Sequence, residues 1–276
     1  MSASSPLPLA SQSFPIAAGP TKRMWQGDYL FLIQNLVAKD FKIRYRNMSL
    51  GVFWSLLNPL VMMGILWFVF TKILQSKIPN FGVFALCGLV PYNVFTTSWL
   101  TGTMSLVENA TLIKRVAVPR ELIPISIVLS NCIHMSAQIL LLLLLVLATG
   151  HHVNRHWIWL LLIWPLEIIF VLGLALIFSS LNVYIRDVRY IVESANLVLF
   201  WLVPIFYDFS NIPAQYAEIV HYNPVAALVM ASRTILLYDA APAASLLLRL
   251  ALSSSLMFCM GLLVFRRLRR GFYNYL

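Results

Sequence analysis

Six long apolar runs constrain this chain more than any other feature of its sequence. A helix needs about 20 mostly apolar residues to cross the hydrocarbon core of a bilayer. We therefore expect six transmembrane helices, at residues 51–73, 81–101, 122–147, 157–180, 191–207 and 244–265. The fifth is short and contains Pro204, but neighbouring helices can satisfy the backbone groups that a proline frees. The predicted fold class is an all-α polytopic membrane protein.

The composition excludes several other classes of protein. Of the 276 residues, 60% are hydrophobic and only 11% are charged, whereas about a quarter of an ordinary soluble domain is charged. These values exclude a soluble enzyme, a disordered chain and a disulfide-rich secreted module. Cys87, Cys132 and Cys259 all lie in apolar runs without CxxC spacing, so we expect them to pack and not to bind a metal.

The positive charges are distributed unevenly between the two sides that six spans define. Fifteen Lys and Arg residues precede the first span, lie in the second and fourth connections, or follow the sixth span. The connections on the other side hold four, and Arg249 lies inside the sixth span. By the positive-inside rule, both termini are predicted to be cytoplasmic. The four on the other side are Lys72, Lys77, Arg155 and Arg233.

Two segments before the first span differ in character. Residues 1–24 are rich in Ser, Ala and Pro, lack the basic start and apolar core of a signal peptide, and are predicted to form a flexible tail. Residues 25–46 are amphipathic, with Trp25, Tyr29, Leu32, Leu36 and Val37 at helical spacing. Their basic end suits an interfacial helix. This helix either serves only as a membrane anchor that sets topology or contributes to function.

Two connections contain short helical patterns. Residues 108–115 favour a short amphipathic helix before Pro119, which is either a docking surface for a partner or part of a charged loop. The last external connection, residues 208–243, is long and apolar. Asn223-Pro224 there predicts a helix start. The apolar residues 225–238 are too short to span, so we expect a re-entrant or interfacial segment that covers an external mouth or packs on the bundle.

Motifs for catalysis are scarce. The chain contains no P-loop, no HExxH and no GxSxG sequence. His151, His152 and His156 have no nearby carboxylate or cysteine, so we do not predict a metal site there. Within the spans, Asn131, His134 and Gln138 share a helical face, and Glu167 lies near mid-membrane. We expect Glu167 to be neutral or paired with a group such as His134 and to hold helices together; proton relay is the alternative.

Aromatic residues gather at the ends of the first and fifth spans. They include Trp54 and Trp67 in the first, and Phe200, Trp201, Phe206 and Tyr207 in the fifth. An aromatic belt at the membrane interface is the usual explanation. The alternative is a path whose ring faces let sugar rings slide past.

From Trp25 onward the sequence resembles the ABC-2 type permeases that export O-antigen, and their relatives for teichoic acid. The resemblance depends on the order and spacing of several motifs. These are residues 42–46 (KIRYR) leading to 49–59 (SLGVFWSLLNP), Glu108-Asn109-Ala110 through Ile113-Lys114-Arg115 to Pro119-Arg120-Glu121, residues 181–187 (LNVYIRD) and Asn223-Pro224.

The resemblance implies a role for each of these segments. It makes residues 25–46 the interface helix and residues 208–243 the external gate region. It makes residues 108–115 the coupling helix on a separate ATPase subunit, with Glu108, Asn109, Thr111, Lys114 and Arg115 as contacts. It also implies two permeases with two ATPases in the bacterial inner membrane. ATP and Mg²⁺ would then belong to the ATPase, and this chain would need no cofactor and would not be an enzyme.

The implied substrate is a polysaccharide attached to a polyprenyl diphosphate lipid. Lys42, Arg44 and Arg46 are expected where the diphosphate enters, since arginine suits bidentate phosphate contact. The polymer path is expected between the first and fifth spans of the two protomers, along Trp54, Trp67, Phe200, Trp201, Phe206 and Tyr207. Teichoic acid, capsule or a small hydrophobic compound are alternative cargos. A membrane enzyme acting on lipid-linked sugars is the alternative of another class.

Overall fold

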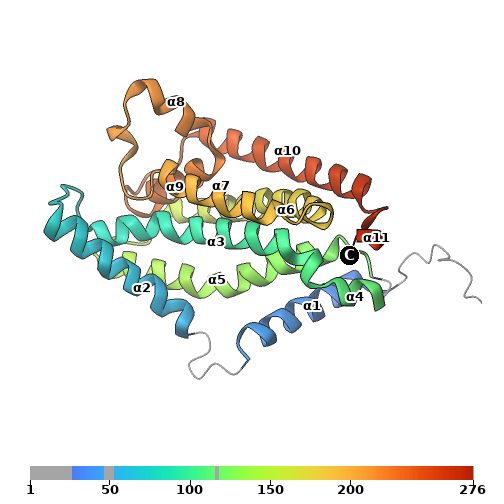
Figure 1. The fold of residues 1–276 in the computed structure, drawn as a ribbon. Coiled ribbons are helices and arrows are strands. Elements are labelled where there is room, and N and C mark those ends of the chain that lie inside the picture. Colours follow the sequence, from blue (N-terminus) through green and yellow to red (C-terminus); the bar gives the residue numbers. More distant parts are fainter. Residues whose placement is uncertain (1–26, 47–52, 116–117, 276) are drawn as a thin grey trace, which may run out of the picture.

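The computed structural model describes residues 27–46, 53–115 and 118–275, and this part of the chain folds into a bundle of helices without strands (Figure 1). The predicted all-α class is therefore confirmed. The helices are α1 Tyr29–Arg44, α2 Phe53–Trp67, η1 Phe68–Ile73, α3 Phe81–Glu108, α4 Ala110–Arg115, α5 Leu122–Ala148, η2 Arg155–Trp159, α6 Leu160–Tyr184, α7 Val188–Leu202, η3 Phe209–Asn211, α8 Ala214–Tyr222, α9 Pro224–Leu236, α10 Ala244–Leu268 and α11 Phe272–Tyr275.

Five helical segments in the described residues are long and apolar enough to cross a membrane, where the sequence predicted six. They are Leu56–Ile73, Phe81–Glu108, Leu122–Ala148, Arg155–Tyr184 and Ala244–Leu268. The exception is the predicted span 191–207. There α7 has 15 residues and ends at Leu202, because Pro204 cannot donate a backbone hydrogen bond and disfavours helix in the residue before it.

The chain nevertheless makes a fifth pass along the bundle. Near the end of α6, Asn182 Nδ2 donates to the Thr103 carbonyl of α3. Further along, the Tyr92 hydroxyl of α3 donates to the carbonyl of Asn196 in α7, and beyond α7 the backbone of Ile205 lies against Gly88. These contacts show that α7 and the segment 203–207 run antiparallel to α3, so irregular backbone completes a pass that a helix begins.

The core of the bundle is α3, which packs against α2, α5, α6, α7 and α9. Beside it, α6 and α10 pack against each other more extensively than any other pair of helices in the described residues, and glycines allow their approach. A Cβ at Gly173 would lie 2.5 Å from the Met257 carbonyl oxygen, and one at Gly261 would lie 2.6 Å from the Gly173 carbonyl oxygen. Small residues are how membrane helices bring their backbones together.

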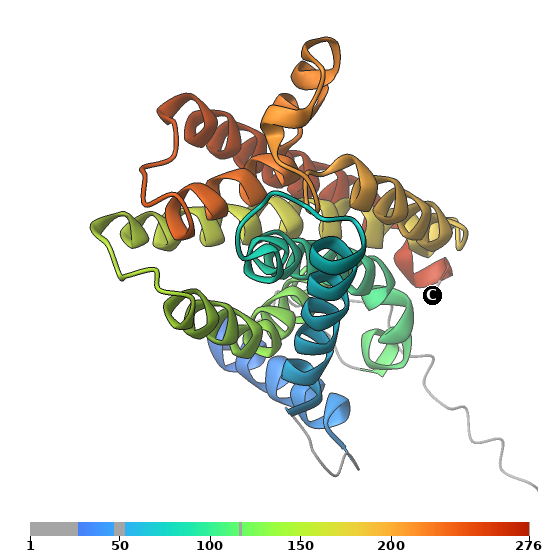
Figure 2. The same cartoon turned by 90° about the vertical axis from the view of Figure 1, so that its left-hand side faces the viewer.

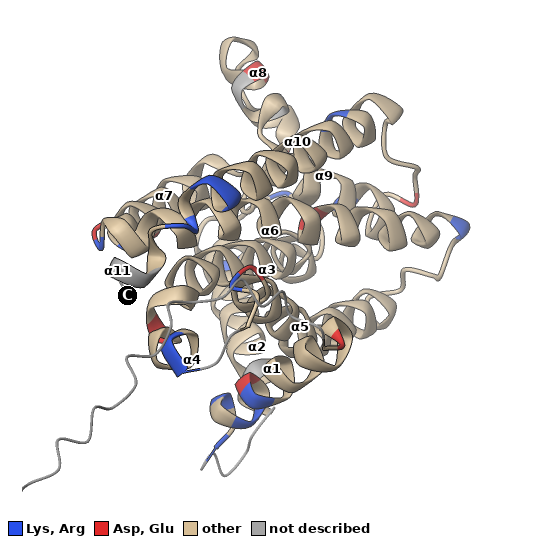
Figure 3. Ribbon diagram, turned by 90° about the vertical axis from the view of Figure 1, so that its right-hand side faces the viewer, with Lys and Arg blue, Asp and Glu red and all other residues tan. Residues whose placement is uncertain are grey.

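The two ends of the bundle differ in what they carry. One, here called the α4 end, holds α4, α11 and the C-terminal part of α10; the other, the α8 end, holds η1, η2 and α8 (Figure 1). Viewed from the α8 end, α8 projects outward from the bundle (Figure 2). Viewed from the α4 end, many of the Lys and Arg residues face the viewer (Figure 3). The positive charges that the sequence predicted on one side of the membrane thus gather at the α4 end. Lys22 and Arg23, which belong to the same predicted group, lie outside the described residues.

One boundary that matters for function differs from the sequence prediction, and one helix start agrees with it. The second span does not end at Thr101 but continues as α3 to Glu108, so the connection after it is shorter than expected. The predicted apolar segment 225–238 is α9, which is buried along most of its length. Asn223 Oδ1 accepts from the Val225 and Ala226 amides and Pro224 opens the helix, as the sequence predicted.

Candidate functional site

The predicted coupling segment 108–115 is not a single helix. Its first residue ends α3, Asn109 breaks the helix, and α4 follows as Ala110–Arg115. Ile113 is buried in a cluster with Leu106 and Phe265, which fixes α4 to the bundle. Thr111, Lys114 and Arg115 are exposed, and their 3 and 4 residue spacing places them on one helical face. This exposed face of α4 is called the coupling surface below.

Asn109 faces inward and connects the end of α3 to α1. Its Nδ2 donates to the Ser105 carbonyl over 2.9 Å, and its Oδ1 accepts from Lys39 Nζ over 2.9 Å. A cleft of about 260 Å³ lies beside this contact, lined by residues of α1, α3 and α5 that include Asp40 and Glu108. Of the predicted coupling residues, Glu108 is therefore exposed beside α4, whereas Asn109 joins two helices of this chain.

α1 lies obliquely along α5 and is held there by polar side chains. Arg44 Nη2 donates to Asn131 Oδ1 over 2.6 Å, and the Ser130 hydroxyl donates to Asp40 Oδ2 over 2.5 Å. The Tyr45 hydroxyl bonds His134 Nδ1. Asn131 is nine residues into α5, which is about 14 Å along the helix at 1.5 Å per residue. α1 thus extends from the α4 end along α5 toward the middle of the bundle. Trp25 lies outside the described residues.

The three residues expected at lipid diphosphate entry have different surroundings. Lys42 and Arg46 are exposed. Arg44 is half-buried, with Nη2 bonded to Asn131 and 3.6 Å from Asp40 Oδ2. The structure therefore brings Lys42 and Arg46 to the surface and gives Arg44 a structural bond within the bundle.

Part of the predicted aromatic path forms a cluster that joins the first and fifth passes. Phe200 lies edge-on to Phe206, with ring centroids 5.2 Å apart, and Phe206 lies 6.0 Å from Phe70 of η1. Trp201 is 67% exposed and contacts both Phe200 and Phe206. Trp54 and Trp67 are exposed on α2. The Tyr207 hydroxyl donates to the Leu202 carbonyl, closing the turn after α7.

Arg233 of α9 holds the irregular segment 203–207. Its side chain is almost fully buried, and its guanidinium donates to the carbonyls of Phe84, Pro204, Ile205 and Tyr207. It also lies 3.6 Å from the centre of the Phe84 ring. Irregular backbone at membrane depth requires such internal partners. From the sequence, Arg233 was predicted only to be one of the external charges. Its position inside the apolar run 225–238 is the feature that distinguishes it from them.

Asp208 and Tyr238 extend this contact toward the surface. The Tyr238 hydroxyl donates to Asp208 Oδ2 over 2.8 Å. Partial burial raises the pKa of Asp208, but hydrogen bonds from the Ser210 amide, the Tyr238 hydroxyl and the Ser210 hydroxyl, with the charge of Arg233, lower it further, so the net pKa is below the usual value. Burial, followed by the bond to Asp208, raises the pKa of Tyr238 to about 12. Tyr238 therefore remains a donor at neutral pH.

The predicted pairing of Glu167 with His134 is wrong. Glu167 is 2% exposed, and it lines a cavity with Cys132 and Met135, while His134 bonds Tyr45 on another side of α5. Met135 and Cys132 flank His134 in sequence but lie on a different helical face from it. Spacing along each span could not show which faces meet.

A comparison with known families decides what this bundle belongs to. The family model of the ABC-2 type transporter matches residues 32–237. The chain belongs to the ABC-2 type transporter family. The match runs from α1 through the end of α9, so it includes the coupling surface, the contacts of α1 with α5, and Arg233.

Three curated relatives have names that describe polysaccharide transport. The chain is 34% identical to the O-antigen export system permease protein RfbA of Klebsiella pneumoniae over 207 residues, which are 74% of this chain and 80% of the relative. It is 29% identical to RfbA of Myxococcus xanthus over 88% of this chain and 95% of the relative. It is 26% identical to the polysialic acid transport protein KpsM of Escherichia coli, over 73% and 79%.

Proposed function

We propose that this ABC-2 transporter chain is the permease subunit of an ATP-driven exporter for a lipid-linked polysaccharide of the O-antigen type. The observation that carries the proposal is the identity of 34% over 207 residues with an O-antigen export permease. The family match at residues 32–237, which includes α4 and α9, supports it. The cargo would be a polysaccharide on a polyprenyl diphosphate lipid, moved from the cytoplasm across the bacterial inner membrane. The α4 end would be cytoplasmic, consistent with its positive charge.

ATP hydrolysis would occur on a separate subunit that docks on the coupling surface. A short helix with a buried anchor and an exposed basic face is suited to this purpose, since Ile113 fixes α4 while Lys114 and Arg115 stay free to contact a partner. Movement of α4 would reach α1 through the bond between Asn109 and Lys39. A pair of permeases with a pair of ATPases is the assembly we propose.

The cargo would enter beside α1 and leave beside the aromatic cluster. Lys42 and Arg46 are exposed on α1 and after it, where a diphosphate in the cytoplasmic leaflet would meet them. At the α8 end, Trp201 presents an exposed ring next to Phe200 and Phe206. Ring faces favour sugar stacking without requiring one sugar identity. The second copy of the chain would complete the path opposite α2 and α7.

The decisive experiment measures ATP hydrolysis by the complex of this chain with its ATPase, with and without lipid-linked O-antigen. We expect the lipid-linked glycan to stimulate hydrolysis. Reversing the charge of the coupling surface with Lys114→Glu and Arg115→Glu should abolish co-purification of the ATPase. The matched control is Lys77→Glu with Arg155→Glu, which reverses two exposed charges at the α8 end. Unchanged assembly in the coupling-surface variant would overturn the assignment of α4.

Entry of the lipid diphosphate is tested separately. Lys42→Glu with Arg46→Glu should prevent stimulation by lipid-linked glycan while basal hydrolysis and assembly remain normal. Normal stimulation in this variant would exclude the entry site. A capsular polysaccharide is the second candidate cargo, favoured by the similarity to the polysialic acid transport protein; stimulation by a lipid-linked capsular glycan and not by an O-antigen would select it.

A further inference from the structure

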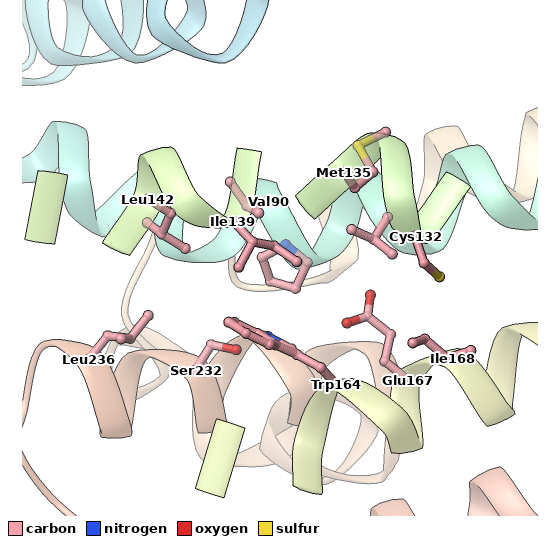
Figure 4. A pocket seen from close by; sticks show the side chains of 12 residues that line it. Val90, Cys132, Met135, Ile139, Leu142, Trp164, Glu167, Ile168, Ser232 and Leu236 are labelled. Atoms are coloured by element: carbon pink, nitrogen blue, oxygen red, sulfur yellow. The ribbon is translucent and has the colours of Figure 1, made fainter. Parts of the chain in front are cut away.

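A partly open pocket lies between the helices of the bundle, away from the surfaces used above. It has a volume of about 140 Å³ and is bounded by α3, α5, α6 and α9 (Figure 4). An apolar cavity of about 150 Å³ accommodates a benzene-sized molecule. Most of its wall is aliphatic or aromatic, including Ile139, Leu142 and Trp164. Its size and lining therefore suit a small ring.

Two buried polar atoms in this cavity lack partners among the described residues. They are Oε1 of Glu167 and Oγ of Ser232, and both side chains are 2% exposed. Figure 4 shows the Glu167 carboxyl directed into the space that faces α5, with the ring of Trp164 between it and Ser232. A buried polar atom without a partner costs about 1–3 kcal/mol, so an occupant that supplies hydrogen-bond donors is favoured.

We propose that this cavity binds a small lipophilic amine that carries one aromatic or aliphatic ring. A protonated amine can donate to Glu167 Oε1, and its positive charge compensates a buried carboxylate. The Trp164 ring adds a face that attracts cations. An anion of the same shape brings no hydrogen-bond donor to Oε1, and a plain hydrocarbon likewise leaves Oε1 without a donor.

Water alone matches the cavity less well. Its volume equals that of four or five waters at about 30 Å³ each, and each buried water needs two to four polar partners. Two acceptor atoms in an otherwise apolar wall support one or two waters and leave the remaining space without partners. The occupant we infer has a polar end at Glu167 and an apolar body for the rest.

The occupant would arrive through the lipid. Ile139 of α5 and Trp164 and Ile168 of α6 are only half-buried, so the wall between these helices reaches the outer surface that the bilayer covers. A lipophilic amine can partition into the bilayer and enter there. Once bound, it would connect α6 with α9 next to Arg233.

Benzylamine binding to the purified chain in lipid nanodiscs tests this proposal, with empty nanodiscs as background. Toluene and benzoate are the neutral and anionic probes of similar size. We expect saturable binding of benzylamine by calorimetry, weaker binding of toluene and no binding of benzoate. Glu167→Gln should weaken benzylamine binding by about tenfold or more and leave toluene binding unchanged. Glu193→Gln, an exposed carboxylate on α7, is the matched control and should bind as the parent does.

Any one of the following results would contradict the proposed amine site. Equal benzylamine affinity in Glu167→Gln and the parent chain excludes the carboxyl as partner, and equal affinity for toluene excludes a role for charge. Absence of saturable benzylamine binding to the parent chain contradicts the proposed amine site. If Glu167→Gln fails to fold by circular dichroism, Ile139→Phe replaces it. That variant fills the cavity and keeps the carboxyl, and retained benzylamine binding in it overturns the proposal.

Discussion

The α4 end and the α8 end of this bundle are held together in different ways. At the α4 end, α1 contacts α5 and α3 through several separate side-chain pairs, such as Lys39 with Asn109 and Arg44 with Asn131. At the α8 end, one guanidinium, that of Arg233, accounts for bonds to four backbone carbonyls. Several partly exposed hydrogen bonds hold α1 at the α4 end, whereas one buried side chain holds the irregular backbone at the α8 end.

This difference has a physical consequence for how each end can move. Polar pairs that are partly open to solvent contribute little individually and can exchange for water. A buried guanidinium among carbonyls has no such exchange, since losing it leaves the acceptors unsatisfied. We therefore expect the α4 end to respond gradually to a partner and the α8 end to behave as a single unit. Four predictions test this comparison, from the largest effect to the smallest.

Arg233→Leu should cause the largest loss of stability. Four carbonyls in the core lose their donor, and each buried unsatisfied acceptor costs about 1–3 kcal/mol, so we expect a loss of about 3 kcal/mol or more in unfolding free energy. Thermal unfolding in detergent measures it. Arg233→Lys keeps a charge but loses the fork geometry and should be intermediate. Arg155→Leu, exposed at the same end, should change stability by less than about 0.5 kcal/mol.

Asn131→Leu should release α1 without unfolding the bundle. Asn131 is fully buried and loses its bonds with Arg44 and Thr101, which costs about 1–3 kcal/mol. Hydrogen exchange of residues 29–44 should accelerate by about tenfold, equivalent to about 1.4 kcal/mol. Asn35→Leu is the matched control, because Asn35 bonds only within α1 and is exposed. Equal protection in both variants would show that Asn131 does not hold α1.

Trp201→Ala should slow glycan transport severalfold and leave stability nearly unchanged. The side chain is 67% exposed, so its removal costs little packing, but it takes away the ring face that we propose for sugars. Trp201→Phe should preserve most transport. Leu197→Ala, on the same exposed face of α7, distinguishes a ring effect from loss of apolar area, and equal slowing by both alanine variants would contradict the aromatic path.

Low pH should weaken the contact between the Tyr238 hydroxyl and the Asp208 carboxylate. The pKa of Asp208 is lowered in the folded protein, so its ionised form favours folding. Its contribution is complete above the unfolded pKa of about 3.9 and disappears as the pH falls through the lower folded value. Proteolysis of residues 208–222 should therefore increase below about pH 4, and Asp208→Asn should remove this increase. Asp187→Asn, at the opposite end, should retain it.

Much of this architecture could be predicted from local sequence. Five of the six predicted spans overlap long apolar helices, since runs of apolar residues are sufficient to define them. The start of α9 at Asn223-Pro224 was predictable because capping depends on neighbouring residues alone. The short helix near residues 108–115 was also predictable, although its break at Asn109 was not. That residue is turned inward by Lys39, which lies 70 positions away in the sequence.

The functional residues also include some that local sequence predicts and others that depend on tertiary contacts. Periodicity showed that Lys114 and Arg115 share a helical face, but only packing of Ile113 against Leu106 and Phe265 showed that this face points outward. The aromatic residues of the fifth pass were visible in the sequence. Their contact with Phe70 of the first depends on the passage of α7 beside α3. The predicted pairing of Glu167 with His134 was wrong because a span's own spacing does not specify which neighbour each face meets.

By itself, the sequence determined that this chain is an all-α membrane protein with its positive charge on one side, because hydropathy and charge act through the surrounding solvent and need no knowledge of packing. The tertiary structure decided which polar groups meet. It joined Arg44 to Asn131, placed Arg233 on the carbonyls that Pro204 leaves free of a helix, and enclosed Glu167 with Ser232. Those contacts join residues far apart in the chain, and a buried polar group depends on the partner that packing brings to it.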